Sequence, residues 1–297
     1  MPPKHRYLDL AAIAICTLAW GTTWFAITLQ LGYVDPVVSL AYRFALAALV
    51  LFAWCGIRGE PLRMTVTQHR SACGIGFFTF TIDYTFIYLA EARISSAIVA
   101  VTFATLSLLN LITFRIVFKQ RAAATAWIAA GLGAAGVALL CWSEIVNTDL
   151  GAQAGIGFGM TCIAVLAAAI GNISARRGEA AGAPVAALTV WAMVYGTMFL
   201  SLYALLTGRA WEFEMSARYV ASLVYLAVIG SVVAFLFYYG LARRRGYASA
   251  AYITALTPPI AMGVSTVFEG KRWGTLAFGG LSLVLFGQWL LLRSRRP

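Results

Sequence analysis

Residues Gly246 to Gly270 read G-Y-A-S-A-A-Y-I-T-A-L-T-P-P-I-A-M-G-V-S-T-V-F-E-G, and this stretch decides the fold. Arginines precede it and Glu269 closes it, so the apolar run between them is long enough to cross a bilayer as a helix. Pro258 and Pro259 stand near its middle. Because proline removes a backbone donor and bends a helix, we expect irregular backbone at membrane depth, where only a protein-lined cavity tolerates it.

The first half of the chain contains a similar stretch. Ile94-Ser95-Ser96-Ala97 opens an apolar run that ends at Phe118-Lys119-Gln120-Arg121, and alignment of Ser96 with Ser249 gives an offset of 153 residues. An offset near half of the 297 residues indicates a duplicated unit.

The composition is that of an integral membrane protein. The chain is 61% hydrophobic and only 11% charged, with a mean hydropathy of +0.82, whereas soluble domains contain roughly 25% charged residues. Continuous apolar runs favour helices over a barrel, so we expect an all-α membrane protein. Ten runs, each near the roughly 20 residues that a bilayer requires, predict ten spans at 8–31, 37–57, 72–90, 94–117, 122–142, 151–174, 184–207, 218–241, 247–268 and 274–293.

The basic residues predict the orientation. With ten spans both termini lie on one side, and that side carries 16 of the 22 basic residues. By the positive-inside rule both termini are cytoplasmic, in a multi-pass protein of the inner (cytoplasmic) membrane. The net charge of +11 is then a topology signal rather than a nucleic-acid-binding face. The acidic residues gather on the other side: Asp35, Glu91, Glu144, Asp149, Glu212, Glu214 and Glu269.

Duplication and topology together predict two inverted units. Residues 1–148 and 149–297 would each supply five helices, and because five is odd, the second unit enters the membrane from the opposite face. Secondary transporters are built this way, with the substrate site near the midplane between the repeats.

Short motifs resemble the drug/metabolite transporter superfamily. Trp20-Gly21-Thr22-Thr23 is similar to its W-G-S/T signature, and Pro36 with Arg43-Phe44 resembles its "P…RF" pattern. The stretch from Tyr239-Gly240-Leu241-Ala242 to Glu269 is similar to the second half of an EamA-type repeat.

This resemblance implies ten helices, no ATP hydrolysis and a central cavity open to one side at a time. The many aromatic residues along the predicted pore look most like exporters of amino acids, including aromatic amino acids, and of some cationic drugs. Two positions depart from the family pattern: Thr105-Leu106 replaces the proline of the fourth span, and Lys119-Gln120 replaces a common closing Glu.

Arg43 and Asp83 are the two charges that clearly lie inside spans, where charges are costly and mark function or a pair. Each lies about 10 Å below the outer surface. One interpretation is an ion pair that locks two helices together. The other is a cavity-facing pair, in which Arg43 holds a substrate carboxylate and Asp83 holds an ammonium group or a proton.

Aromatic and polar residues complete the predicted substrate site. Trp20, Thr23 and Trp24 share one helix face, which suits a flat or aliphatic side chain, although packing between helices also explains them. Tyr88 is shallow enough for an aromatic belt at the interface. The other candidates are Tyr42, Tyr84, Asn172, Tyr195, Tyr239 and Tyr252, with Pro258 and Pro259 as gating residues. The small residues Gly131, Gly133, Gly136, Gly279 and Gly280 predict close helix contacts.

The motifs of other chemistries are missing from the sequence. The five cysteines have no metal-like spacing, both histidines fall outside the spans, and no hydrolase, metalloprotease or Walker motif is present. We expect no catalytic residues, no metal and no cofactor.

The predicted function is secondary transport by a monomer. We expect export of amino acids, aromatic ones among them, and of related small metabolites or drugs, by alternating access within the lipid bilayer. A sugar-nucleotide or phosphate carrier would need several basic residues in the cavity, and only Arg43 is there. An intramembrane enzyme using Asp83 and Tyr84 would lack a second catalytic group, and saturable counterflow would argue against a channel.

Overall fold

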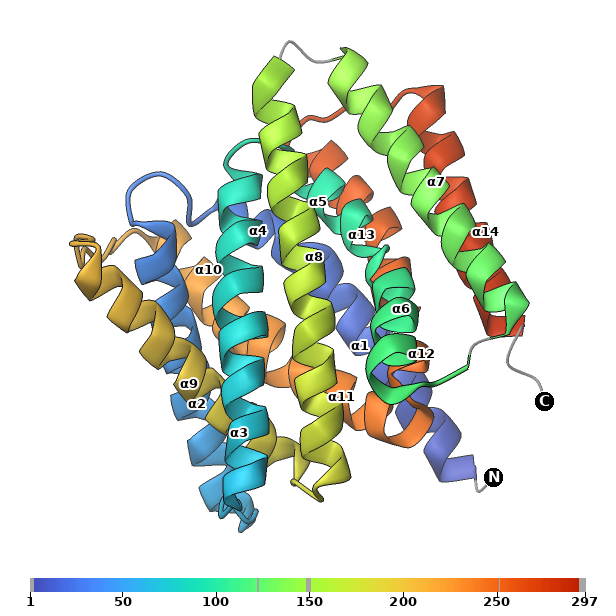
Figure 1. The fold of residues 1–297 in the computed structure, drawn as a ribbon. Coiled ribbons are helices and arrows are strands. Elements are labelled where there is room, and N and C mark those ends of the chain that lie inside the picture. Colours follow the sequence, from blue (N-terminus) through green and yellow to red (C-terminus); the bar gives the residue numbers. More distant parts are fainter. Residues whose placement is uncertain (1–2, 122, 148–150, 251, 294–297) are drawn as a thin grey trace.

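The computed structural model describes residues 3–121, 123–147, 151–250 and 252–293, and every regular element among them is a helix (Figure 1). The predicted all-α class is confirmed. In chain order the helices are α1 (Pro3–Thr28), α2 (Pro36–Arg58), α3 (Val66–Ile75), η1 (Gly76–Asp83), α4 (Tyr84–Glu91), α5 (Ser96–Phe103), α6 (Leu106–Phe118), α7 (Ala124–Asn147), α8 (Gly151–Ala180), α9 (Val185–Leu206), α10 (Ala217–Ala227), η2 (Val228–Val233), α11 (Ala234–Arg245), α12 (Tyr247–Ala250), α13 (Tyr252–Phe268) and α14 (Thr275–Arg293).

Hydropathy and length identify membrane spans among the described helices. Seven segments are long and apolar enough to cross a bilayer: Tyr7–Thr28, Pro36–Arg58, Val66–Glu91, Ser96–Phe118, Gln153–Ala180, Val185–Leu206 and Ala217–Arg245. Three shorter apolar helices are Ala124–Leu140, Leu256–Phe268 and Thr275–Gly287. Together these segments overlap the ten predicted ranges. Ten crossings and the inverted arrangement of the two halves stay predictions.

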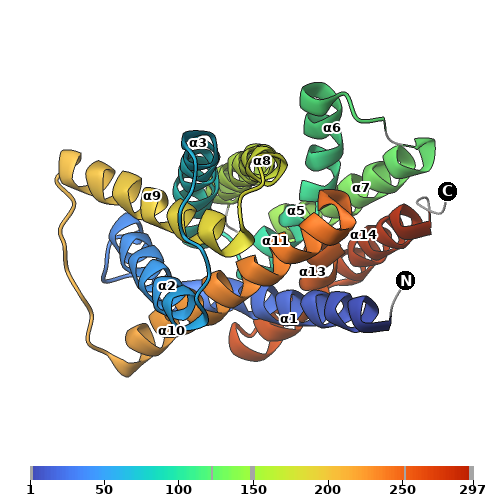
Figure 2. The same ribbon diagram turned by 90° about the horizontal axis from the view of Figure 1, so that it is seen from below.

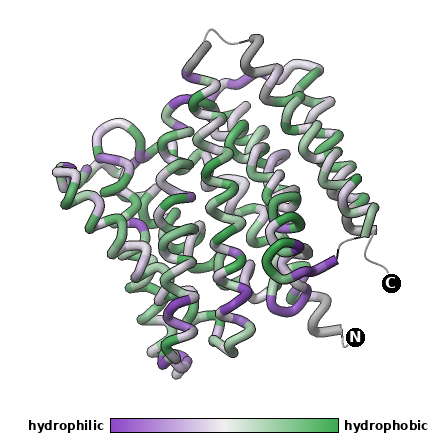
Figure 3. The backbone as a smooth tube through the Cα atoms, viewed as in Figure 1, coloured by the Kyte–Doolittle hydropathy of each residue, from purple (hydrophilic) through white to green (hydrophobic). Residues whose placement is uncertain are grey.

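The chain runs back and forth along one axis of the molecule. The start of α1 and the end of α14 lie toward the same end in Figure 1. Figure 3 shows hydrophobic residues along most of the helices and hydrophilic ones concentrated at the helix ends and loops. This distribution suits rods that expose apolar sides to lipid and polar ends to water.

The third and the eighth predicted spans each contain a π-helical segment. η1 lies between α3 and α4, and η2 lies between α10 and α11. In each, a hydroxyl donates to the carbonyl five residues earlier: Thr81 to Gly76 at 3.0 Å, and Ser231 to Leu226 at 2.9 Å. These two bonds lie about 150 residues apart in the chain. Short π-helical segments within α-helices are frequent at functional sites.

The fourth and ninth predicted spans differ from expectation. α5 ends at Phe103 and α6 begins at Leu106, so the helix is interrupted although no proline is present. By contrast, α13 is helical through Pro258 and Pro259, which corrects the expectation of irregular backbone there. Pro258 cannot donate to the Thr254 carbonyl, and the Thr257 hydroxyl donates to it instead at 2.9 Å.

Contacts between the two halves of the chain occur in matched pairs. α2 packs against α9, and α7 packs against α14, which lie side by side at one edge of the molecule (Figures 1 and 2). The contact of α1 with α13 has a counterpart in that of α6 with α8. Likewise, α3 with α9 matches α10 with α2, and α4 with α8 matches α11 with α1. Each contact thus recurs with the roles of the halves exchanged.

Glycines allow α7 and α14 to approach closely. A Cβ atom at Gly136 would lie 2.5 Å from the carbonyl oxygen of Gly280, and one at Gly280 would lie 2.6 Å from that of Gly136. The predicted close contact is therefore confirmed at these two glycines. It is wrong at Gly131, where nothing lies within 4 Å of the added carbon.

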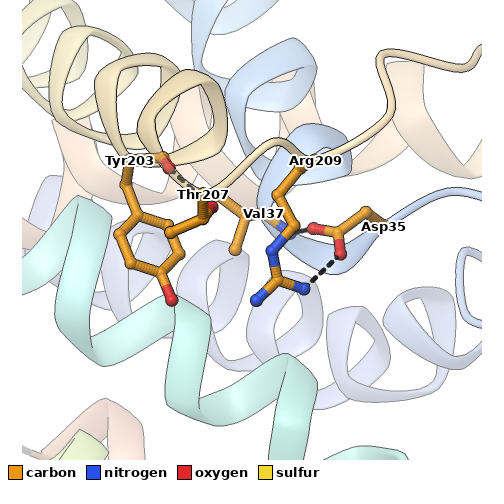
Figure 4. A network of polar contacts seen from close by, with 5 residues as sticks. All are labelled: Asp35, Val37, Tyr203, Thr207 and Arg209. Carbon is orange, nitrogen blue, oxygen red and sulfur yellow. Dashed lines mark hydrogen bonds and ion pairs between the residues drawn. The ribbon is translucent and has the colours of Figure 1, made fainter.

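The two halves also meet where the segment before α2 approaches the segment after α9 (Figure 4). The Asp35 carboxylate accepts from the backbone N–H of Val37 at 2.8 Å and so caps α2. Its other oxygen accepts from Arg209, just beyond α9, at 2.8 Å. The hydrogen bond and charge of Asp35 raise the pKa of the Arg209 guanidinium. One residue thus caps a helix of the first half and binds a loop of the second.

Candidate functional site

A central cavity lies among helices from both halves of the chain. It contains about 670 Å³ of empty space, including space open to solvent, between side chains of α1, η1, α4, α5, α6, α8, α11 and α13. The lining residues are Trp20, Thr23, Trp24, Ile27, Thr79, Asp83, Tyr84, Ile87, Phe103, Leu106, Ala168, Asn172, Phe235, Tyr238, Tyr239, Thr254 and Thr257. Rings dominate this wall, with hydroxyls, one amide and one carboxylate among them.

Many of the residues predicted for the site line this cavity. They are Trp20, Thr23, Trp24, Asp83, Tyr84, Asn172 and Tyr239. Pro258 and Pro259 lie within α13 and directly follow the lining residue Thr257. The backbone of Tyr252 begins α13, but its side chain lies outside the described residues.

Trp20 connects the cavity wall to the π-helical segment η2. Its ring packs against Phe235 and Tyr238, with centroids 5.4 and 5.2 Å away. Its indole Nε1 donates to the carbonyl of Gly230 at 3.2 Å. Two glycines here are tightly packed. A Cβ atom added at Gly230 would lie 2.6 Å from Thr23, and one added at Gly21, next to Trp20 in the chain, would lie 2.6 Å from Ile260. The Trp-Gly-Thr-Thr stretch therefore fits α1 against η2 and α13.

Trp24 lies one turn further along α1. Its ring lies 5.0 Å from that of Phe103, centroid to centroid. The side chain is buried, yet its Nε1 has no hydrogen-bond partner among the described residues. A buried indole N–H beside a cavity is a donor available to a ligand.

Asp83 is the acidic side chain among the residues that line the cavity. It ends η1 and is only 3% exposed. Its Oδ1 has no hydrogen-bond partner among the described residues. Burying a carboxylate oxygen without a partner is costly, so this atom has room for a proton or for a cationic donor.

Arg43 lies behind the Tyr84 ring rather than in the cavity wall. It is fully buried, and its Nε donates to the Ser231 hydroxyl at 3.1 Å. Its Nη1 donates to the Tyr88 hydroxyl at 3.5 Å. The guanidinium carbon lies 4.6 Å from the centroid of the Tyr84 ring. Its Nη2 has no hydrogen-bond partner among the described residues.

Arg43 and Asp83 do not form an ion pair in the described part of the chain, so the helix-locking interpretation is wrong. Since Tyr84 both touches the guanidinium and lines the cavity, Arg43 is one ring away from the cavity. Both groups are therefore buried without pairing, and one atom of each, Asp83 Oδ1 and Arg43 Nη2, has no hydrogen-bond partner among the described residues.

Three predicted tyrosines lie outside the cavity lining. Tyr88 is fully buried and donates to Gln30 Oε1 at 2.7 Å, so its interpretation as an interfacial belt residue is wrong. Tyr42 packs against Trp211 and Phe213. Tyr195 contacts His69, with its hydroxyl 3.1 Å from Nδ1.

Sequence reasoning also missed residues of this region. Phe235 and Tyr238 share one face of α11 with Tyr239, as their spacing of three and four residues indicates. Glu91, grouped with the acidic residues of the outer side, is only 7% exposed, and neither of its carboxylate oxygens has a partner among the described residues. Because Glu91 stands at the end of a predicted span, the sequence placed it at the membrane surface and gave no sign that it is buried.

Sequence comparison matches most of the chain to one family. The sequence model of the EamA-like transporter family matches residues 9–142 and, separately, residues 155–293. A solved structure described as "Crystal structure of protein" superposes with a TM-score of 0.75. The alignment covers 97% of this chain and 98% of that chain at 17% identity, which supports the fold alone.

Curated relatives are similar over nearly their whole length. The "Uncharacterized transporter" of Archaeoglobus fulgidus is 22% identical over 284 residues, 95% of this chain and 98% of the relative. The "Uncharacterized inner membrane transporter YedA" of Escherichia coli K12 is 25% identical, covering 91% and 85% of the two chains. "Protein PagO" of Salmonella typhimurium is 25% identical, covering 95% and 91%.

Proposed function

Because the chain belongs to the EamA-like transporter family, it is a membrane transporter, and we propose that it exports amino acids, aromatic ones in particular, together with related small metabolites or drugs. The observation that carries this proposal is a pair of buried groups of opposite sign, Asp83 and Arg43, whose Oδ1 and Nη2 atoms have no hydrogen-bond partner among the described residues. They lie beside a cavity with aromatic walls.

A zwitterion satisfies both groups at once. Its ammonium donates to Asp83, and its carboxylate accepts from Arg43 once the Tyr84 ring moves aside. Each new bond is charge-assisted and forms away from bulk water, where such bonds are strong. Two buried charges that do not bind each other are costly to keep, and a ligand that pairs with both offsets that cost.

The aromatic wall suits the rest of the substrate. Trp20, Trp24 and Tyr84 surround a space whose polar groups are few, as in sites that bind flat or aliphatic side chains. Lys and Arg do not occur among the residues that line the cavity. A phosphate or sugar-nucleotide carrier requires such residues in the cavity wall, so this alternative is disfavoured.

The proposed mechanism is alternating access between two inverted repeats, residues 1–148 and 149–297. The two separate family matches, the mirrored helix contacts and the paired π-helical segments support it. Left-handed backbone positions also recur about 150 residues apart: Gly32 and Gly182, Gly59 and Gly208, Lys119 and Gly270. Pro258 and Pro259 remove backbone bonds in α13 and are the proposed bending point.

The proposed location is the inner membrane with both termini cytoplasmic. The relative YedA is named an inner membrane transporter. The excess of basic residues on the side of the termini favours this orientation.

Counterflow in proteoliposomes tests the proposal. Three indole compounds separate the two charged contacts: tryptophan carries both groups, tryptamine lacks the carboxylate, and indole-3-propionate lacks the ammonium. We expect saturable tryptophan counterflow by the unmodified protein. Asp83→Asn should lose counterflow of both tryptophan and tryptamine. Arg43→Gln should transport the two compounds equally and so lose the preference for tryptophan.

Arg70→Gln is the matched control, because Arg70 is exposed and outside the cavity lining. Size-exclusion profiles in detergent verify that each variant is folded. Tryptophan counterflow that is absent, or unchanged in folded Asp83→Asn and Arg43→Gln proteins, would contradict the proposal.

A further inference from the structure

A second cavity lies between the central cavity and the end of the molecule that carries the start of α1. It encloses about 1130 Å³ among α6, α7, α8, α11 and α12, including space open to solvent. Its lining residues are Asn110, Leu111, Phe114, Gln120, Arg121, Ala123, Ala126, Arg176, Glu179, Ala242, Arg243, Gly246 and Tyr247. We call it the lower cavity.

A pair of asparagines separates the lower cavity from the central one. Asn172 lines the central cavity, and Asn110 lines the lower one. Asn172 Nδ2 donates to Asn110 Oδ1 at 3.2 Å, and the Tyr238 hydroxyl donates to Asn172 Oδ1 at 3.5 Å. Both asparagines are buried, at 4% and 2% exposure. A single side-chain hydrogen bond therefore links the lining of one cavity to the lining of the other.

Asn110 presents an unused donor at this partition. Its Nδ2 has no hydrogen-bond partner among the described residues. A buried amide N–H without an acceptor is costly, so a ligand that supplies an acceptor gains by binding there. The positive-inside rule explains arginines at a membrane surface, but it does not explain this buried donor.

The lower cavity has the opposite electrostatic character to the central one. Arg121, Arg176 and Arg243 line it, with Glu179 as the acidic residue among its lining. Glu179 pairs with Arg176 at 3.4 Å. Positive charge is therefore in excess here, whereas Asp83 is the charged residue among the lining of the central cavity.

We propose that the lower cavity is a second binding station of the transport path, which binds the carboxylate of the substrate before the Asn110–Asn172 bond opens to the central cavity. The arginines attract the carboxylate, and Asn110 Nδ2 donates to it at the partition. The inference rests on the proposed function, because it assumes that the substrate carries a carboxylate.

The first test measures transport kinetics in proteoliposomes supplied from the side of the lower cavity. We expect Arg121→Gln and Arg176→Gln each to raise the KM for tryptophan roughly two- to fivefold, as the loss of one partly exposed charge contact would. The kcat should be unchanged, and tryptamine should be unaffected because it has no carboxylate. Arg63→Gln is the control, since Arg63 is exposed and outside the lower cavity lining.

The second test needs no transport. In an Ile87→Cys variant the new thiol lies in the wall of the central cavity. Its modification by a small methanethiosulfonate from the side of the lower cavity should accelerate several-fold when Asn110→Ala is added. The same protein without Ile87→Cys corrects for the natural cysteines.

The outcomes separate the two proposals. Equal KM changes for tryptophan and tryptamine, or no change for either, would overturn the carboxylate station while the central site stands. An unchanged Ile87→Cys labelling rate would overturn the asparagine gate. Absence of tryptophan transport would overturn the proposed function, and the labelling result would still decide whether the partition opens.

Discussion

Ser231 accepts a hydrogen bond from Arg43 Nε at 3.1 Å and donates its own hydroxyl to the Leu226 carbonyl at 2.9 Å. One fully buried serine therefore serves two groups that the membrane interior cannot hydrate. It bonds to a carbonyl near the end of α10, just before η2, and it holds the guanidinium from the other half of the chain against Tyr84. The position of Arg43 thus depends on the π-helical geometry of η2.

Replacing this serine should destabilise the protein. Ser231→Ala removes one hydrogen bond to a buried carbonyl and one from a charged donor, so we expect the free energy of unfolding to fall by about 1–3 kcal/mol. Ser282→Ala is the control, because Ser282 is exposed and its hydroxyl donates to the Phe278 carbonyl in its own helix. Thermal unfolding in detergent measures both, and equal melting temperatures for the two variants would exclude this role.

The two tryptophans of α1 should respond in opposite ways to replacement by phenylalanine. Trp20→Phe removes the donor to the Gly230 carbonyl, and we expect a loss of about 1–2 kcal/mol of stability. Trp24→Phe removes a buried N–H that has no partner among the described residues, so stability should hold or rise while substrate affinity falls.

Unfolding in detergent and quenching of the remaining tryptophan fluorescence by substrate separate these two effects. A Trp24→Phe protein that loses stability but keeps its affinity would show that the indole N–H is structural.

Glycines of α7 should differ sharply in their tolerance of alanine. Gly136→Ala places a methyl group against the Gly280 carbonyl, which should separate α7 from α14 and cost about 1–3 kcal/mol. Gly131→Ala, one and a half turns earlier in the same helix, meets nothing within 4 Å and should be neutral or stabilising by up to about 1 kcal/mol. Similar melting temperatures for both variants would argue against close packing here.

The Asp35–Arg209 contact allows a cap to be compared with an exposed ion pair. Asp35→Ala loses the acceptor that caps α2 and should cost about 1 kcal/mol more than Arg209→Gln, which removes an exposed ion pair worth at most about 1 kcal/mol. Asp35→Asn keeps a capping oxygen and should resemble Arg209→Gln. Added salt should reduce the effects of both Arg209→Gln and Asp35→Asn, whereas the difference between Asp35→Ala and Asp35→Asn should not change with salt. A salt-sensitive difference would count against the cap.

Much of the fold follows from hydropathy, because a backbone in lipid must satisfy its own hydrogen bonds and does so as helix. The predicted ranges overlap the helices, and Arg43 and Asp83 were singled out because charges at membrane depth are rare. The helix is interrupted between Phe103 and Leu106. The sequence has no proline there, so proline rules do not predict this break. The helix continues through Pro258, where the Thr257 hydroxyl donates to the Thr254 carbonyl in place of the missing proline N–H. The general expectation that proline breaks a helix does not include this contact.

The sequence by itself determined that this is an all-helical membrane protein, and it predicted two similar halves and charged groups at membrane depth. Only the tertiary structure decided which atoms those charges contact. Arg43 bonds to Ser231, 188 positions away, instead of Asp83. Hydropathy is a local sum along the chain, whereas the direction of a side chain depends on the rotation of its helix. One extra residue in a π-helical turn shifts every following side chain by about 100° around the axis, and no local pattern records that shift.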